Sequence, residues 1–363
     1  MSGTTQNGIT SADEPSSGAL SQRDILNLLT ERIDVQRKGV GIVVGVIDED
    51  GRRVISHGVV SQDNPQPVNA DTVFEIGSLT KVFTSLLLVD MVLRGEVSLD
   101  DPVAKFLPPG VTMPMRGEKQ IALIDLATHT SGLPRLPDNM SPRDLANPNA
   151  DYSVEKLYEF LGTYRLNRDI AEEFEYSNLG AGLLGHVLAL RKGVDFETLM
   201  TQRVLTRLGM SSSAITLRDC LKARIATGHD KELRPTSNWE MSVLAGAGGL
   251  LSTANDLLCF LAAALDYVVT PLNAAIAAQL ATRRPTGTMG LETALGWSIF
   301  TNSAGEAALH NGRTGGYRSF MGFDPMMRVG VVALSNASTV AGDDDIGLSV
   351  LKTLCSGPRY RTS

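Results

Sequence analysis

The stretch Phe74-Glu-Ile-Gly-Ser-Leu-Thr-Lys81 places a serine and a lysine three residues apart, with a glycine just before the serine. An almost unbroken apolar run over 82–93 follows and predicts a helix. Ser78 would then lie at the helix N-terminus, with Lys81 one turn further on the same face. The backbone N–H groups at such an end favour the negative charge that develops on oxygen during acyl transfer. If burial or a positive neighbour lowers the pKa of the Lys81 amine, that amine can accept the serine proton.

The same spacing occurs a second time, in Ser153-Val-Glu-Lys156. There the serine precedes an amphipathic segment and is better explained as a helix N-cap. Serine and lysine are both common, so the spacing alone is weak support for a catalytic pair. A catalytic role for Ser78 and Lys81 therefore needs support from other residues in the chain.

Composition excludes several classes of function. The chain has 363 residues, a net charge of −7 and no block of Lys and Arg, which argues against a nucleic-acid or membrane partner. No uninterrupted apolar stretch reaches the length of about 18 residues that a membrane span needs, so 82–93 is expected to be a buried core helix. The three cysteines are widely spaced and are interpreted as core or near-surface residues. We expect no metal and no cofactor.

The N-terminal residues 1–20 are predicted to form a disordered tail. Residues 1–18 are rich in Ser, Thr, Gly and Asn and lack both the basic start and the apolar core of a signal peptide. We therefore expect a cytoplasmic protein. The sequence leaves the oligomeric state open.

The order of predicted elements indicates an α+β fold. The expected strands are 41–47 and 53–60 near the start of the chain, and 295–300, 307–310, 317–323 and 329–335 near its end. The expected helices are 21–36, 78–94, 121–127, 153–162, 178–191, 195–207, 252–264, 271–281 and 345–354. This order predicts one antiparallel sheet built from both chain ends, with a helical middle that forms a second lobe and covers one sheet face.

Two further stretches could complete a site around Ser78. Tyr176-Ser-Asn178 stands at the start of a predicted helix, where a phenol and an amide can both face a cleft. The phenol could act as a base if neighbouring cations such as Lys81 depress its pKa. The alternative is that Ser177 or Asn178 caps the helix while Tyr176 packs on the core.

The other stretch is His310-Asn-Gly-Arg-Thr-Gly-Gly-Tyr317, at the end of a predicted strand. Its glycines would let a substrate approach the backbone closely, and its N–H groups could bind an extended acyl chain. His310 and Arg313 supply positive charge or hydrogen bonds. A glycine-rich hairpin turn is the simpler alternative. His129, the competing histidine, is interpreted as a structural loop residue.

Taken together, these stretches resemble the serine β-lactamase and penicillin-binding-protein superfamily, in its class C branch. That branch also contains D-alanyl-D-alanine peptidases, family VIII esterases and several acyltransferases. The resemblance covers about 41–336 and rests on five segments in the family's order. They are 74–81, 126–134, 176–178, 248–253 and 310–317.

The resemblance implies a β-lactamase/transpeptidase-like fold and a set of roles. It predicts one catalytic unit over 21–358, with a sheet lobe at 21–75 and 285–358 and a helical lobe at 76–284. Ser78 would be the acylated nucleophile, Lys81 its hydrogen-bond partner and Tyr176 the general base. The oxyanion hole would use the backbone N–H groups of Ser78 and Arg313. The residues expected to bind substrate are Asn178, His310, Asn311, Gly312 and Arg313.

One departure from the family shapes the expected function. The third motif of typical class C β-lactamases is Lys-Thr-Gly, and here it is His310-Asn311-Gly312. Neutral histidine is a weaker anion ligand than lysine, which favours ester, D-amino-acid peptide or acyl-transfer chemistry over efficient β-lactam hydrolysis. We therefore predict a serine acyl hydrolase acting through an acyl-enzyme on a small-molecule substrate: an ester, amide or β-lactam. The alternatives are a cytoplasmic biosynthetic acyltransferase that uses the same Ser78 acyl-enzyme, and a binding or sensor protein without turnover.

Overall fold

The computed structural model describes residues 20–303, 305–339 and 346–356, and its centre is one eight-stranded antiparallel sheet. The strand order is β2-β1-β14-β13-β12-β11-β10-β9, and β1 pairs with β14 along its length. The two ends of the chain therefore share one sheet, as predicted. Its strands are β1 (Gly41–Asp48), β2 (Gly51–Gly58), β9 (Arg283–Pro285), β10 (Leu291–Ala294), β11 (Ser298–Asn302), β12 (Gly305–Arg313), β13 (Arg318–Asp324) and β14 (Val329–Ser335).

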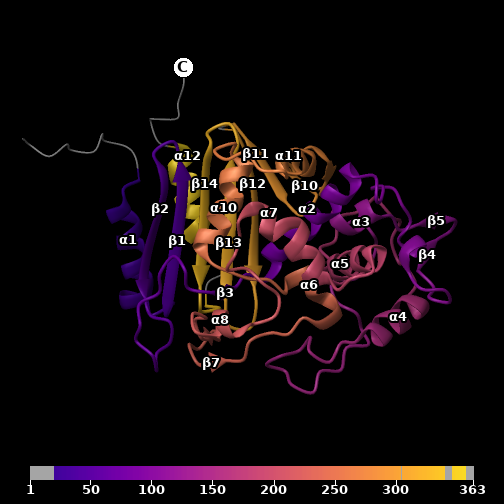
Figure 1. Ribbon diagram of the computed structural model, residues 1–363, viewed down its shortest axis with the longest axis horizontal. Helices are drawn as coiled ribbons and strands as arrows, with labels where there is room; N and C mark the ends of the chain where they lie inside the picture. The colour runs from indigo at the N-terminus through magenta and orange to yellow at the C-terminus, as the bar shows by residue number, and fades with distance from the viewer. Residues whose placement is uncertain (1–19, 304, 340–345, 357–363) are drawn as a thin grey trace, which may run out of the picture.

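Helices flank this sheet and fill the middle of the chain (Figure 1). The longer ones are α1 (Gln22–Thr30), α2 (Thr80–Leu93), α4 (Val154–Thr163), α5 (Asn178–Lys192), α10 (Ala254–Ala264), α11 (Asn273–Ala281) and α12 (Ile346–Ser356). The shorter ones are α3 (Leu123–Ala127), α6 (Phe196–Met200), α7 (Thr206–Leu208), α8 (Asp219–Lys222) and α9 (Ala245–Gly248). Within the described ranges, no helix is both long enough and apolar enough to cross a bilayer.

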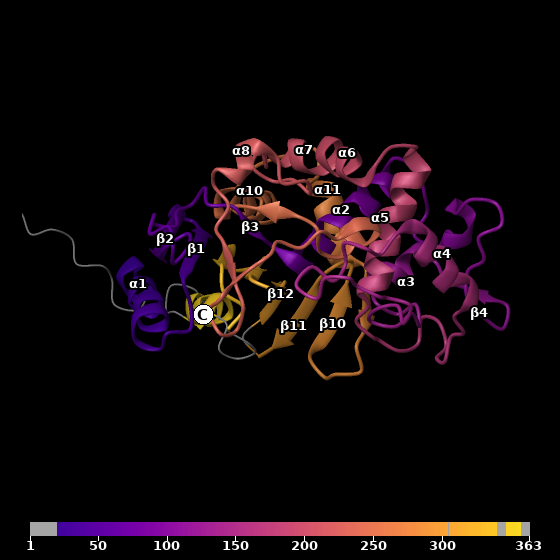
Figure 2. The ribbon, with the colours of Figure 1, turned by 90° about the horizontal axis from the view of Figure 1, so that it is seen from below.

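The two faces of the sheet bury alternate residues of the same strands. In β1, Ile42, Val44 and Val46 pack in a cluster with α1 and α12. The intervening Val43 and Ile47 join the larger core on the opposite face. That face carries α10, and a side chain on Gly45 would lie 2.9 Å from Leu258 of that helix. Figure 2 shows α10 and α11 together on one side of the strands.

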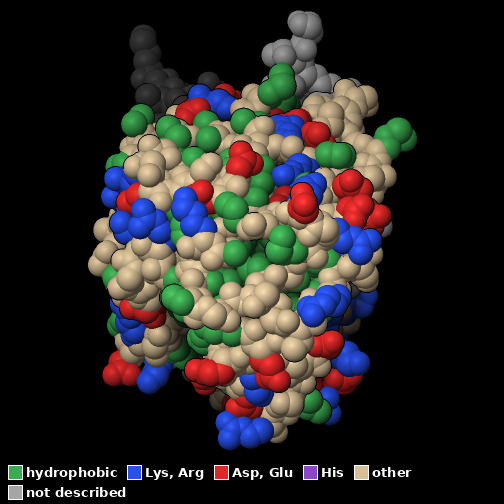
Figure 3. Space-filling view, turned by 90° about the vertical axis from the view of Figure 1, so that its right-hand side faces the viewer, with side chains coloured by type: hydrophobic (Ala, Val, Ile, Leu, Met, Phe, Trp, Pro, Cys, Tyr) green, Lys and Arg blue, Asp and Glu red, His purple; other side chains and the backbone are tan. Residues whose placement is uncertain are grey.

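The helix that follows Ser78 is a core element. Twelve of the fourteen residues of α2 are buried, and apolar side chains occur all round it. Such a helix is buried on every side, which confirms the interpretation of 82–93 as a core helix rather than a membrane span. The neighbouring helices α5, α9 and α11 pack against it. On the outer face of the helical lobe, acidic and basic side chains are interspersed (Figure 3).

Three small strand pairs lie outside the main sheet, and one of them positions the stretch 74–81 that contains Ser78. The strand β3 (Phe74–Glu75) pairs with β8 (Leu251–Ser252), and the Ile76 amide donates to the carbonyl of Leu250. The other pairs are β4 (Met115–Arg116) with β5 (Lys119–Gln120), and β6 (Gly228–His229) with β7 (Pro235–Thr236). The chain just before Ser78 is therefore fixed to a segment about 175 residues later in the sequence.

Several predicted boundaries were inexact. The expected helices 21–36 and 195–207 each contain a π-helical turn, at Glu31–Val35 and Thr201–Leu205. The expected strand 307–310 extends over Gly305–Arg313, and the short strands β9 and β10 were not predicted. Residues 1–19 of the predicted tail lie outside the described residues. The boundaries of the catalytic unit and its two lobes stay a prediction.

Packing of α10 on the sheet gives a test of the core. Leu258 is fully buried against β1, so Leu258→Ala should lower the free energy of unfolding by about 2–5 kcal/mol through lost contacts and a cavity. The same substitution at Leu145, which is 85% exposed, should change it by less than about 0.5 kcal/mol. Urea unfolding of both variants measures the difference. Equal losses would contradict this packing.

Candidate active site

Ser78 lies in a short 3₁₀ turn that connects β3 to α2. The turn spans Gly77–Leu79, and α2 itself begins at Thr80, so the serine precedes the α-helix rather than opening it. Gly77 has a φ of +50°, a left-handed conformation that favours glycine. The Thr80 hydroxyl donates to the Gly77 carbonyl at 2.7 Å, which holds the turn closed. The backbone thus bends sharply where Ser78 projects.

Lys81 is buried and surrounded by three oxygen atoms. Its Nζ lies 3.0 Å from Oγ of Ser78, 2.8 Å from Oδ1 of Asn178 and 2.7 Å from the carbonyl oxygen of Ala247. The residue is 2% exposed. Burial, aided by the nearby charge of Arg135, holds the pKa of the Lys81 amine well below its usual value.

The charged amine can donate to all three oxygens, and the neutral amine also fits these contacts. The neutral form has two N–H donors and one lone pair. The donors can serve the two pure acceptors, the Asn178 amide oxygen and the Ala247 carbonyl, and the lone pair then faces the Ser78 hydroxyl. The geometry therefore places a proton acceptor 3.0 Å from the serine oxygen.

Tyr176 contacts the same serine from the other side. Ser177 is the N-cap of α5, where its hydroxyl accepts from the Gly180 amide and donates to the Pro134 carbonyl. This fixes the preceding Tyr176, whose phenol hydrogen bonds with Ser78. Burial raises the pKa of Tyr176 to about 12, although the Ser78 hydrogen bond and the charge of Arg135 oppose that rise.

The condition set for a basic phenol, a pKa depressed by cations, is therefore not met. At the Tyr176 phenol, burial outweighs the charge of Arg135. Tyr176 is therefore protonated at ordinary pH, whereas the lowered pKa of Lys81 lets that amine lose its proton more readily than an exposed lysine does. This arrangement makes Lys81 the better placed base and Tyr176 a proton donor.

The strand β12 crosses directly over the Ser78 turn. Pairing of β12 with β11 stops at Leu309, so residues 310–313 pair only with β13. A Cβ on Gly312 would lie 2.1 Å from the Ile76 carbonyl oxygen and 3.0 Å from the Ser78 amide nitrogen. A Cβ on Gly77 would lie 2.9 Å from the Arg313 amide nitrogen. The two glycines let the backbones cross and bring the amides of Ser78 and Arg313 to one place.

His310 lies close to Ser78 and Lys81 but is buried and does not face the substrate cleft. It is 7% exposed, its Nδ1 is 2.7 Å from the Asn311 carbonyl oxygen, and it does not line the cleft described below. Burial, followed by the influence of Lys81, lowers the pKa of His310 to about 4. A histidine with this pKa is neutral at ordinary pH and does not supply the positive charge of the lysine it replaces.

His129 supports Tyr176 rather than facing substrate. Its ring packs on the Tyr176 ring with centroids 4.5 Å apart, and its Nδ1 accepts from the Ser177 amide at 3.1 Å. Burial holds the pKa of His129 well below its usual value. These contacts agree with the prediction of a structural loop residue.

A cleft of about 600 Å³ opens over Ser78, a volume within the range of small-molecule sites. Six of the predicted site residues line it, while Lys81 and His310 lie behind its wall. The six are Ser78, Tyr176, Asn178, Asn311, Gly312 and Arg313. The loop 134–149, rich in Pro, Asn and Asp, is expected from the sequence to border a site, and five further lining residues come from it: Arg135, Leu136, Met140, Pro148 and Asn149. Thr314 and Gly315 lie in the 310–317 stretch. The sequence reasoning missed the other lining residues, which are Trp239, Met241, Leu244 and Arg318.

Glu75, within the stretch 74–81, positions the loop that carries Trp239. Its Oε1 accepts from the Asn238 side chain and from the Trp239 backbone amide, both at 2.8 Å. Burial raises the pKa of this carboxyl, against the hydrogen bonds that lower it. No sequence pattern pairs Glu75 with a loop more than 160 residues away, so only the fold shows this role.

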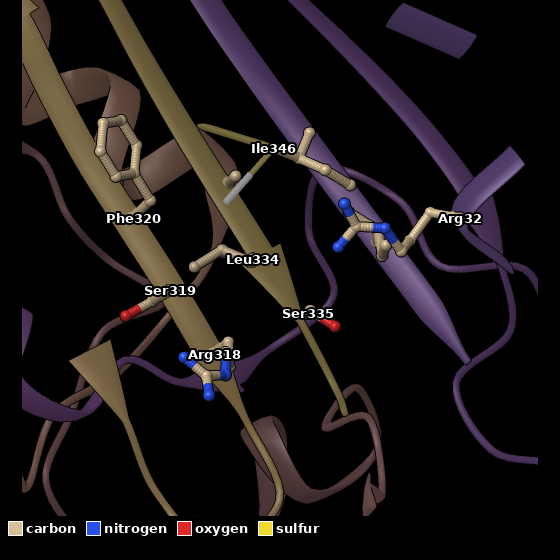
Figure 4. Close-up of a pocket in the computed structure, with 9 residues that line it drawn as sticks. Arg32, Arg318, Ser319, Phe320, Leu334, Ser335 and Ile346 are labelled. Atoms are coloured by element: carbon tan, nitrogen blue, oxygen red, sulfur yellow. The ribbon is translucent and has the colours of Figure 1, made fainter. Parts of the chain in front are cut away.

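Two other hollows are poorer candidates. The one in Figure 4 lies between Arg32 and the strands β13 and β14, and its volume of about 30 Å³ holds little more than a water molecule. The other, of about 440 Å³, contains His186, whose Nε2 is 2.8 Å from the Tyr158 hydroxyl, but its lining has no serine–lysine pair. Among the residues that the structure describes, no three His, Cys, Asp or Glu side chains gather as a metal site.

Comparison with known proteins agrees with the fold. The family model described as Beta-lactamase matches residues 26–351. A beta-lactamase of Pseudomonas fluorescens is 28% identical over 86% of this chain and 93% of its own length. The D-alanyl-D-alanine-carboxypeptidase/endopeptidase AmpH of Escherichia coli is 28% identical over 92% of this chain and 89% of its own. A crystal structure of a class C beta lactamase from Rhodobacter sphaeroides superposes with a TM-score of 0.78, at 25% identity over 91% of this chain and 98% of that one.

The glycine crossing predicts a sharp effect of one methyl group. Gly312→Ala should push β12 away from the Ser78 turn, because its Cβ would overlap the Ile76 carbonyl. We expect the rate of Ser78 labelling by a fluorophosphonate probe to fall by about a hundredfold. A displacement of the Ser78 and Arg313 amides relative to the Ser78 oxygen lowers reaction rates by about that factor. Gly162→Ala, where a Cβ meets nothing within 4 Å, is the matched control and should label normally. Normal labelling of Gly312→Ala would contradict the crossing.

Proposed function

This chain belongs to the beta-lactamase family of serine hydrolases, and we propose that it is an acyl hydrolase that forms an acyl-enzyme on Ser78. The observation that carries the proposal is the contact of 3.0 Å between the Ser78 oxygen and a buried Lys81 amine whose pKa is held well below its usual value. A serine hydroxyl needs such a partner because it is a weak nucleophile while it keeps its proton. The cleft of about 600 Å³ over Ser78 gives a small acyl substrate access to it.

The proton path follows from the resting state of the site. Ser78 Oγ attacks the acyl carbonyl carbon, and its proton passes to the Lys81 nitrogen. The oxygen of the tetrahedral intermediate gains its negative charge beside the Ser78 and Arg313 amides, which stabilise it. The Tyr176 phenol donates a proton to the departing group and is reprotonated from Lys81, which leaves the acyl-enzyme and a neutral amine. Water then repeats the sequence in reverse and releases the acid.

We propose small esters and amides, including peptides of D-amino acids, as the substrates. The buried, neutral His310 cannot replace the lysine that attracts the carboxylate of a β-lactam. The printed activities of the two relatives, beta-lactamase and D-alanyl-D-alanine carboxypeptidase/endopeptidase, both fit an acyl-enzyme. Transfer of the acyl group to an amine or alcohol would use the same intermediate and is the alternative.

Replacement of the nucleophile tests the proposal. Wild-type protein should hydrolyse a 4-nitrophenyl acyl ester, and Ser78→Ala should lower kcat/KM by at least about a thousandfold because the acyl group has no acceptor. Ser153→Ala, at the second serine–lysine spacing, is the matched control, since Ser153 only caps α4. Intact mass should show an acyl adduct on the wild type alone. Retained turnover in Ser78→Ala would refute the assignment, and a rise in transfer product with added amine would favour the acyltransferase.

The state of Lys81 predicts the pH profile. The amine accepts the serine proton only when neutral, so kcat/KM should rise with pH through the lowered pKa of Lys81 and then level off. Tyr176 keeps its proton until about 12, so its ionisation should cause no decline up to about pH 10. Lys81→Arg should be inactive across this range, because a guanidinium does not lose its proton. A fall in kcat/KM between about pH 7 and pH 10 would contradict a neutral amine as base.

A further inference from the structure

The cleft over Ser78 is lined by cationic side chains without acidic ones. Three arginines line it, Arg135, Arg313 and Arg318, and no Asp or Glu is among its lining residues. Arg318 has another interaction and is set aside. Within the described ranges, no carboxylate pairs with Arg135 or Arg313. Cations left unpaired beside a substrate cleft attract an anionic ligand.

Arg135 is fixed close to the reacting groups. Its guanidinium carbon lies 5.0 Å from the centroid of the Tyr176 ring, in a cation–π contact. Its backbone carbonyl accepts from the amides of Asn178 and Leu179, at 3.0 and 3.2 Å, so it is joined to the first residues of α5. The backbone of Arg135 is therefore joined to the start of α5 beside Asn178, and its exposed side chain lies over the Tyr176 ring.

In the absence of a ligand, the charge of Arg135 makes Lys81 a weaker base. Its charge is near enough to lower the pKa values of both Lys81 and His129. A bare cation beside a base that must accept a proton weakens that base. A substrate carboxylate on the guanidinium would cancel this effect and form charge-assisted hydrogen bonds in the fork geometry that arginine offers.

We infer that Arg135 recognises a carboxylate in the acyl part of the substrate, on the side of Asn178. The inference rests on the proposed acyl-enzyme at Ser78 and names its substrate class: esters or amides of short dicarboxylic acids whose second carboxylate remains free. Arg313 also lines the cleft but ends β12, after the glycine crossing, and we assign the carboxylate to Arg135 because it is joined to α5 beside Asn178. His310 is excluded because it is buried and neutral.

A matched pair of esters tests the inference. Mono-4-nitrophenyl adipate and 4-nitrophenyl hexanoate differ only by a carboxylate in place of the terminal methyl group. The wild type should prefer the adipate, and Arg135→Gln should lower the adipate-to-hexanoate ratio of kcat/KM on the order of tenfold, the size of one lost charge-assisted hydrogen bond. The hexanoate has no second carboxylate and reports how the substitution alters the reaction itself, so the adipate-to-hexanoate ratio isolates the part of the change that depends on the carboxylate.

The controls locate the effect. Arg135→Lys keeps the charge and should retain part of the preference, while added salt should weaken it in the wild type. Arg23→Gln, on the exposed surface of α1, should leave the ratio unchanged. An unchanged ratio in Arg135→Gln, or a loss of preference in Arg313→Gln instead, would overturn the assignment.

A binding measurement separates this inference from the proposed function. The Ser78→Ala protein lacks the nucleophile, and its affinity for adipamate and for the neutral hexanamide can be measured by calorimetry. We expect adipamate to bind more tightly, and the Arg135→Gln change in the same background to remove most of that difference. Equal binding of the two would overturn the role of Arg135 whether or not Ser78 is acylated. Absence of any acyl adduct on wild-type Ser78 would instead refute the proposed function.

Discussion

Burial of one lysine amine is the constraint on which the site depends. Water would stabilise the charged form of Lys81, and the fold removes that water almost completely. An isolated ammonium in such a place is costly, and losing the proton is the cheaper solution. The three oxygens around Nζ can accept from the charged amine, and they also suit the neutral one, because two of them can only accept and the third belongs to a hydroxyl that can donate. Desolvation thereby lowers the pKa of the Lys81 amine, so that it can act as a base beside Ser78 more readily than an exposed lysine could.

The rest of the fold keeps that amine dry and in place. Helix α2 is buried on all sides, so Lys81 projects from a core element and not from the surface. The Ala247 carbonyl comes from α9, and the Asn178 amide from the start of α5. Strands β3 and β12 then fix the Ser78 turn from outside the helix, through β-pairing and the glycine crossing. Two distant segments, α5 and α9, thus reach hydrogen-bond distance of the Lys81 amine, while β3 and β12 hold the Ser78 turn.

The sequence predicted what depends on local pattern and spacing. The sheet from both chain ends followed from alternating apolar segments, and Ser78 and Lys81 followed from their spacing and neighbouring motifs. The second spacing also behaves as predicted, because Ser153 caps α4 while the Lys156 amine contacts Ser141. Burial and loop shape could not be predicted. Long-range packing determines the lowered pKa of His310 and the raised pKa of Tyr176. It also brings the Trp239 amide to the Glu75 carboxylate, where the two form a hydrogen bond. The short strands β9 and β10 carry too little pattern to be recognised.

Arg135 gives the site a link between recognition and chemistry. Together with burial, its positive charge lowers the pKa of Lys81 and so favours the neutral amine while the cleft holds no anion. When a substrate carboxylate pairs with the guanidinium, the net charge near Lys81 falls and the affinity of the amine for a proton rises. The base then becomes stronger at the moment when the serine proton must be transferred. On this argument the arginine would favour its substrate twice, once by binding the anion and once through the base, and an uncharged ester would gain neither advantage.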